Sequence, residues 1–365
     1  MKTRIVGAVL FLLAALCPAT FWAQKNLNEK KWKDVVRYMP AQWYGSEEAA
    51  KIADQLIARQ MDNGGWQKNI PYHHLLTPVE LKKVNRTGVG ATIDNNSTTM
   101  EMTYLAKVYA LRKEARYKDA FLHGLQYLIN AQYPNGGWPQ FYPARPKVPY
   151  ASHITYNDDA MVNVMKVLYD IARDRKPYDA LALDEAWKAK ASQSFQRGVE
   201  CILHTQIVVD GKPTVWCAQH DEHTLAAAPA RAFELASFSG GESVGIVRLL
   251  MSLPHPSDSI VRAVDGAVEW FRTHEVKDMK VEHFIGANGE PDARVVSAPG
   301  HVMWARFYDL KTGKPFFCDR DGVKRTELSQ VGQERRGGYS WYITSPQKVL
   351  DEYPLWRQKV EVSHR

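Results

Sequence analysis

Residues 56–66 read LIARQMDNGGW, and residues 128–138 read LINAQYPNGGW. Seven of the eleven positions match at a constant spacing of 72 residues. A looser third copy contains Gln206 and, after a four-residue insertion, Trp216. Repeats of this length are typical of architectures in which one supersecondary unit is used several times. The fold is therefore expected to consist of three related units.

Each copy has a helical apolar pattern upstream of a glycine pair, which predicts a helix that ends at a left-handed cap and a turn. A second series of helices is expected between these loops, over residues 94–112, 157–173 and 239–251. These segments begin with Asp, Asn and Ser, which are good N-cap residues. Two alternating series imply three helix pairs. We therefore predict an all-α fold, an (α/α)3 toroid of three helix pairs with short peripheral strands.

Strand signals are few, and they are clearest at residues 207–209 and 295–296. We expect an irregular segment over residues 280–342. With 45% apolar residues the chain can bury a core and is not disordered. We predict one folded domain over residues 24–365.

The first 23 residues differ from the rest of the chain. Lys2 and Arg4 precede an apolar run over residues 5–16, and small residues follow at Ala19 and Ala23. This three-part pattern is typical of a secretory signal peptide, too short for a comfortable transmembrane helix. We predict a signal peptide over residues 1–23 and an exported protein, either secreted or periplasmic, without stable membrane insertion after cleavage.

The charge and the cysteines exclude several classes of protein. The formal net charge of +7 is modest, and no run of five Lys and Arg residues occurs, so a nucleic-acid partner is not expected. The cysteines that remain after processing can form at most one disulfide, and we expect all three to be buried thiols: Cys201, Cys217 and Cys318. A monomer is the expected state.

Polar clusters begin the first two helices of the second series. Asp94-Asn95-Asn96 and Asn157-Asp158-Asp159 occupy equivalent positions in successive units. Oxygen ligands without clustered His or Cys suit a hard cation such as calcium. Ordinary N-capping is the alternative, although a cap needs only one side chain.

Three arginines lie among apolar or aromatic neighbours: Arg231, Arg306 and Arg320. Near an acidic metal cluster they would form a receptor for an anionic sugar, because the guanidinium group matches carboxylates. Internal ion pairs are the alternative. The repeat tryptophans are expected to fill the core rather than to stack on sugars, because they occupy a position that defines the repeat: Trp66, Trp138 and Trp216.

Several blocks of sequence, in order, resemble the pectate lyases of polysaccharide lyase family 10. The blocks are RQMDNGGWQKN, TIDNNSTTMEMTYLA, AQYPNGGWPQFYP, ITYNDDAMVNVM, VWCAQHDEHTL, ARAFELASFSGGES and GYSWY. The resemblance covers residues 43–342, nearly the whole chain after the signal peptide. The resemblance implies a toroid of three helix pairs and endo-acting β-elimination of polygalacturonate with calcium as cofactor.

The resemblance also implies roles for individual residues. Asp94 and Asp158 would bind the calcium ion, and Arg231 would be the catalytic base. Substrate would be bound by the remaining residues of the matched blocks: Asn95, Thr99, Arg306 and Arg320.

A guanidinium base conflicts with the high pKa of arginine. We expect the pKa of Arg231 to be lowered by the nearby calcium ion and the other arginines. His223, Lys68 and Tyr339 are the substitutes if this account fails.

Two other functions fit the same residues. A glycoside hydrolase on a helical toroid would use Asp94 and Asp158 as paired carboxylates without needing a metal. A noncatalytic protein would bind an acidic polysaccharide through its arginines and cleave nothing.

Overall fold

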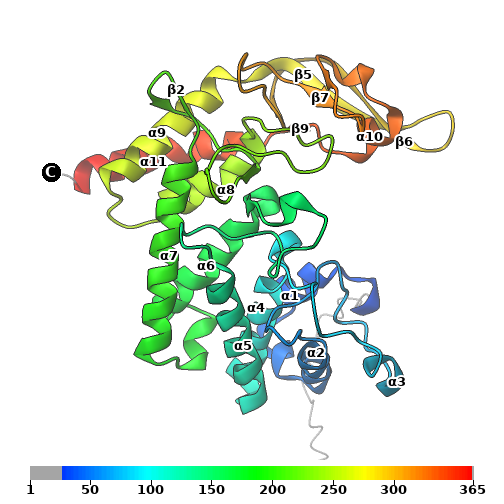
Figure 1. The fold of residues 1–365 in the computed structure, drawn as a ribbon, viewed down its shortest axis with the longest axis vertical. Helices are drawn as coiled ribbons and strands as arrows, with labels where there is room; N and C mark the ends of the chain where they lie inside the picture. Colours follow the sequence, from blue (N-terminus) through cyan, green and yellow to red (C-terminus); the bar gives the residue numbers. More distant parts are fainter. Residues whose placement is uncertain (1–26, 364–365) are drawn as a thin grey trace, which may run out of the picture.

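The computed structural model describes residues 27–363, so the predicted signal peptide lies outside the described residues. Helices dominate the described chain (Figure 1). The α-helices are α1 (Trp32–Tyr38), α2 (Glu47–Ala58), α3 (Pro78–Leu81), α4 (Thr99–Arg112), α5 (Ala115–Ala131), α6 (Ala160–Ala172), α7 (Glu185–Thr205), α8 (Gly240–Met251), α9 (Asp258–Thr273), α10 (Gln333–Gly338) and α11 (Pro346–Ser363). None of these helices is long and apolar enough to cross a membrane.

The longer helices form three consecutive pairs, α4 with α5, α6 with α7 and α8 with α9. The first helices of successive pairs also pack together, α4 against α6 and α6 against α8. Helices α1 and α2 cover α4 at one end of the series, and α11 packs against α8 and α9 at the other (Figure 1). This arrangement confirms the predicted (α/α)3 toroid of three helix pairs.

The glutamine of each repeat joins two parts of the fold. The side-chain amide of Gln60 donates to the carbonyl of Gly64 in its own loop (2.7 Å) and to that of Ala120 in α5 (2.9 Å). The other copies repeat this pair of bonds: Gln132 with Gly136 and Ser194, and Gln206 with Thr214 and Ala263. Each glutamine thus fixes the end of one helix against the helix of the next pair. It gives the carbonyl of its own loop a donor, and it adds a second donor to a carbonyl inside the next helix.

The repeat tryptophans lie in the core, as predicted. Trp66, Trp138 and Trp216 are fully buried. Each indole N–H donates to a carbonyl in the last turns of the preceding helix, at 2.9, 2.7 and 2.7 Å. Glycine is required where the ring meets a helix, because a Cβ at Gly124 would lie 2.9 Å from the Trp66 ring. The sequence repeat therefore corresponds to a repeated packing unit.

Two strands are longer than predicted. Strand β5 (Val276–Ile285) and strand β6 (Pro291–Ala305) form an antiparallel hairpin that lies beside the helices (Figure 1). The expectation of an irregular segment from residue 280 is wrong over this hairpin. Its residues are mostly exposed or half-buried, so the apolar alternation that marks a strand is weak.

The other strands have two residues each, which agrees with the prediction of short strands. They are β1 (Ile154–Thr155), β2 (Val208–Val209), β3 (Lys212–Pro213), β4 (Gln219–His220), β7 (Phe317–Cys318), β8 (Lys324–Arg325) and β9 (Tyr342–Ile343). Strands β1 and β4 pair, β2 pairs with β3, β7 with β8, and β9 with β6.

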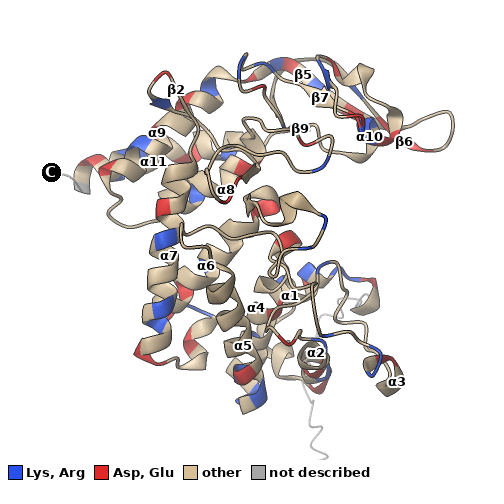
Figure 2. Cartoon of the chain, in the orientation of Figure 1, with Lys and Arg blue, Asp and Glu red and all other residues tan. Residues whose placement is uncertain are grey.

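The cysteine prediction is confirmed, because Cys201, Cys217 and Cys318 are buried free thiols. Positive and negative residues are interspersed along α7 and α9 (Figure 2). This distribution agrees with a modest net charge that serves solubility.

Gln132 offers a direct test of the hydrogen bonds made by the repeat glutamines. Besides its two donor bonds, its carbonyl oxygen accepts from Ser194 Oγ at 2.7 Å and from Arg197 at 2.5 Å. We expect Gln132→Ala to lower the free energy of unfolding by about 2 to 4 kcal/mol, because buried polar groups lose their partners. The measurement is urea unfolding followed by circular dichroism.

Gln126→Ala is the matched control, since among residues 27–363 its exposed amide bonds only to Asn130 on the same helix. We expect a change within about 0.5 kcal/mol. Equal losses in the two variants would contradict the role assigned to Gln132.

Candidate active site

A pocket of about 210 Å³ lies where the N-terminal ends of the first helices of the pairs meet. Two short 3-10 helices, η3 (Asp94–Asn96) and η5 (Asn157–Asp159), precede α4 and α6 and contact one another. The segment between β4 and α8 closes the opposite side. Four predicted site residues line the pocket: Asp94, Asn95, Asp158 and Arg231.

The two 3-10 helices have the same backbone conformation. Asn95 has φ 52° and ψ 36°, and its equivalent Asp158 has φ 53° and ψ 33°. Asn and Asp tolerate this left-handed region better than other non-glycine residues. A right-handed helix cannot run through left-handed residues. Helices α4 and α6 therefore begin after them, at Thr99 and Ala160, rather than at the predicted residues 94 and 157.

The N-capping alternative is not supported. The residue at the N-cap of α4 is Thr98, that of α6 is Asp159 and that of α8 is Ser239, and none of the three side chains makes a capping hydrogen bond. Asp94 and Asn157 lie before these caps. The polar clusters are therefore available to the pocket.

Asp94 is almost fully buried and has three donors. Its carboxylate accepts from the backbone of Asn95 at 3.0 Å, from Gln140 Nε2 at 3.0 Å and from Lys68 Nζ. Lys68 and Gln140 line the same pocket. Lys68 gives Asp94 a local counter-charge.

Lys68 and Gln140 follow the repeat tryptophans Trp66 and Trp138 by two residues each. Sequence reasoning included Lys68 only as a substitute base and missed Gln140. The repeat contained the signal, because equivalent positions of repeated units are expected to lie in equivalent places. The third copy places Ala218 there, and its carbonyl accepts from the backbone N–H groups of Tyr156 and Asn157, both at 2.9 Å.

Asp158 has no cation in ion-pair contact among residues 27–363. Burial raises the pKa of its carboxyl, the negative charge of Asp94 raises it further, and Arg306 opposes both effects. Its backbone N–H donates to Glu242 Oε2 at 2.9 Å. Asp158 is thus a second carboxylate near Asp94, and no ion pair among the described residues neutralises its negative charge.

Arg306 is close enough to act on this carboxylate electrostatically, but it is not part of the pocket lining. It forms an ion pair with Glu242 (2.9 Å), donates to Asn157 Oδ1 (3.2 Å) and lies 4.7 Å from the centre of the Tyr339 ring. Burial raises the pKa of Glu242 to about 7. The structure therefore favours the internal ion pair over direct contact with substrate for Arg306.

Arg320 and Thr99 also lie outside the pocket lining. Arg320 is exposed and forms an ion pair with Glu334 at 3.0 Å, so the alternative of an internal ion pair applies to it. The buried Thr99 hydroxyl donates to the carbonyl of Asn96 at 2.9 Å. Both residues flank the site without facing it.

Arg231 lines the pocket opposite the acidic loops, and it is held by Glu234 through two bonds of 2.7 and 2.5 Å. This carboxylate raises the pKa of Arg231 above its ordinary value. The expectation that its neighbours lower the pKa is therefore wrong for this arrangement. Tyr339 donates to Glu234 at 2.8 Å, whereas His223 is exposed and outside the pocket lining.

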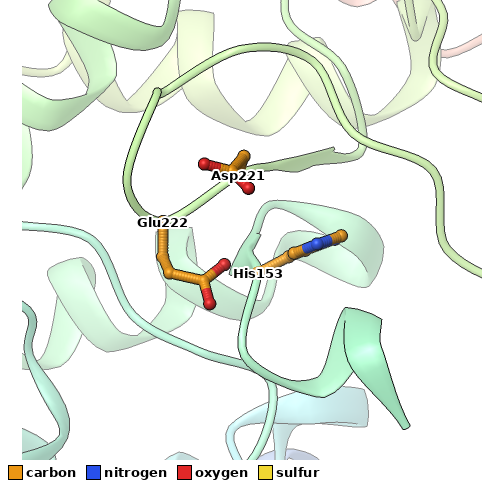
Figure 3. Close-up of side chains that lie close together, drawn as sticks. All are labelled: His153, Asp221 and Glu222. Atoms are coloured by element: carbon orange, nitrogen blue, oxygen red, sulfur yellow. The ribbon is translucent and has the colours of Figure 1, made fainter.

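A second group of possible metal ligands lies outside the pocket. One ligand atom from each of His153, Asp221 and Glu222 lies within 4.8 Å of the others (Figure 3). The β1–β4 pairing brings them together, because Ile154 pairs with His220. Two locations could therefore receive a cation, and only the pocket contains the predicted ligands.

Comparisons with known proteins agree with this geometry. The family model for pectic acid lyase matches residues 60–350. The family 10 polysaccharide lyase from Cellvibrio cellulosa is 34% identical, with a TM-score of 0.73, over 88% of this chain and 95% of that one. A mutant of a family 10 polysaccharide lyase from the same organism, solved in complex with trigalacturonic acid, has the same identity and coverage and a TM-score of 0.74. Curated proteins give no significant match. The chain belongs to the pectic acid lyase family and is a family 10 polysaccharide lyase.

Proposed function

We propose that this lyase cleaves polygalacturonate by calcium-assisted β-elimination. The observation that carries the proposal is the pocket in which Asp94 and Asp158, on equivalent loops, face Arg231. The trigalacturonic acid bound to a similar lyase supports the same class of substrate for this chain. Family membership argues against the glycoside hydrolase and against the noncatalytic binder.

The donor set of the pocket fits a calcium ion. Asp94 and Asp158 offer carboxylate oxygens, Asn95 offers an amide oxygen, and no thiol or imidazole is needed. A cation there would offset the burial and the like charge that raise the pKa of Asp158. Bound calcium would supply Lewis-acid stabilisation of the charge that develops on the substrate carboxylate.

The remaining chemistry is assigned to side chains of the pocket. Arg145 lines it, lies 3.9 Å from the centre of the Phe141 ring, and has no ion-pair partner among residues 27–363, so its guanidinium is free to bind a galacturonate carboxylate. The neutral form of Arg231, after loss of its proton to solvent, takes the proton from C5, and the electron pair of that C–H bond forms the C4–C5 double bond. The C4–O bond breaks, and water protonates the leaving oxygen.

Arg231 must leave its ion pair with Glu234 to act as a base, because this pair favours the protonated guanidinium. A protonated guanidinium that is paired with Glu234 cannot accept a proton. We infer that calcium and substrate in the pocket weaken this ion pair, because the Arg231 side chain is half-exposed at the edge of the pocket.

The proposed enzyme is exported and acts as a monomer. The signal peptide predicted over residues 1–23 and an extracellular polymer as substrate are consistent with a secreted or periplasmic enzyme. Neither nucleic acid nor membrane is needed as a partner.

The function is tested by ultraviolet absorbance with polygalacturonate as substrate. We expect absorbance to rise as unsaturated ends form, and to stop rising when a chelator removes calcium. New reducing ends without a rise in absorbance would contradict elimination.

Two variants locate the cation in the same assay. Asp158→Asn should lower calcium-dependent activity by about 100-fold, and it should raise the free energy of unfolding at pH 7. A raised carboxyl pKa means that the ionised form destabilises the folded state, so removing the charge removes that cost. Asp221→Asn, in the second group, should leave activity near the wild-type level. The opposite pattern would move the cation to the second group.

The role of Arg231 is tested through its partner. Glu234 raises the pKa of Arg231, so Glu234→Gln lowers it and increases the neutral fraction at any given pH. We expect the alkaline rise of the pH–rate profile to move to lower pH by about one unit. Glu334→Gln is the control, because it removes a carboxylate that pairs with Arg320 and Arg335 outside the pocket. An unchanged profile for Glu234→Gln would count against Arg231 as the base.

A further inference from the structure

A second cavity, of about 390 Å³, adjoins the catalytic pocket. It lies between the start of α4 and the chain that follows Trp66, and it shares Asn95 with the catalytic pocket. Lys68 points to the catalytic pocket, whereas its neighbour Asn69 lines the second cavity. The side chains of Asn95 and Asn69 are joined by a hydrogen bond of 2.9 Å. The two spaces are therefore adjacent along a possible path of a polymer.

The second cavity differs from the catalytic pocket in charge. The catalytic pocket is lined by three cationic side chains: Lys68, Arg145 and Arg231. The second cavity has no Lys or Arg in its described lining, and its one charged residue is Glu101. Burial raises the pKa of Glu101 to about 7, so above neutral pH a galacturonate carboxylate placed there would meet a like charge, with no cation of this lining to offset it.

Glu101 is 1% exposed and has an unused oxygen. Its Oε1 accepts from Trp32 Nε1 at 2.7 Å, whereas its buried Oε2 has no hydrogen-bond partner among the described residues. Buried polar atoms are normally satisfied, so an unpartnered acceptor in a cavity lining points to a ligand that donates. A sugar hydroxyl is such a donor.

The rest of the lining has two polar residues, Gln67 and Ser97, and an apolar wall of four residues: Trp32, Ile70, Pro71 and Met100. Apolar and aromatic walls with few polar groups are typical of sites for neutral ligands. Such a wall would contact the ring face of a sugar and the methyl group of an ester.

We propose that this cavity is a subsite for an uncharged unit of the polymer, a methyl-esterified galacturonate next to the unit bound in the catalytic pocket. The inference rests on the proposed function, because it takes the occupant of the catalytic pocket to be galacturonate. It assigns to the lyase a preference for partly esterified pectin, with an ester at a fixed distance from the cleaved bond.

The test compares a randomly and partly methyl-esterified polygalacturonate with the same polymer after complete de-esterification. Mass spectrometry of the products gives the position of each ester relative to the new unsaturated end. We expect esters at one fixed position to be enriched about tenfold over a random distribution, the effect of one uncompensated charge in a partly buried site.

Met100→Lys should abolish the enrichment, because it places a cation in the cavity, while Met100→Gln is the neutral control of similar length and should retain it. Glu101→Gln keeps an acceptor for Trp32 and should weaken the preference by removing the like charge. Unsaturated products with randomly placed esters would overturn the subsite and leave the proposed function intact. The absence of unsaturated products from both polymers would instead overturn the proposed function.

Discussion

The pair of hydrogen bonds made by each repeat glutamine is the constraint on which the active site depends. Gln60, Gln132 and Gln206 each tie the loop after one helix to a helix of the next pair. The tryptophan of the same loop is then fixed in the core by its indole N–H. Two residues beyond each tryptophan the chain reaches the pocket, through Lys68, Gln140 and Ala218. The repeat therefore builds the fold and delivers one position per unit to the site.

The site combines these positions with buried negative charge. Asp158 lies in a surrounding that raises its pKa, and Glu242 beneath it has a pKa raised to about 7. Arg306 compensates part of this charge through its ion pair with Glu242, and Lys68 compensates the charge of Asp94. Asp158 keeps no ion-pair partner among residues 27–363, and it lines the pocket where a calcium ion and a polyanionic substrate would meet. Functional sites commonly retain such unfavourable electrostatics at a cost in stability.

Much of this arrangement was predictable from the sequence. The spacing of Gln and Trp implied three helix pairs, and the equivalent clusters at Asp94 and Asp158 implied a shared polar end. The helix starts were wrong because Asn95 and Asp158 adopt left-handed conformations, which composition does not reveal. The β5–β6 hairpin was missed because its exposed strands carry little apolar alternation. The pairing of Arg231 with Glu234 depends on a turn outside any helix, so the direction of the Arg231 pKa shift could not be read from sequence spacing.

The central claim is that the acidic loops bind cation and substrate together in one pocket. Isothermal titration calorimetry of Arg231→Ala with trigalacturonate, at zero and at saturating calcium, tests it most directly. Linkage requires each ligand to tighten the other by the same factor, and we expect a factor of about ten or more. In the same background, Asp158→Asn should remove this coupling. Equal trigalacturonate affinity with and without calcium would contradict the claim.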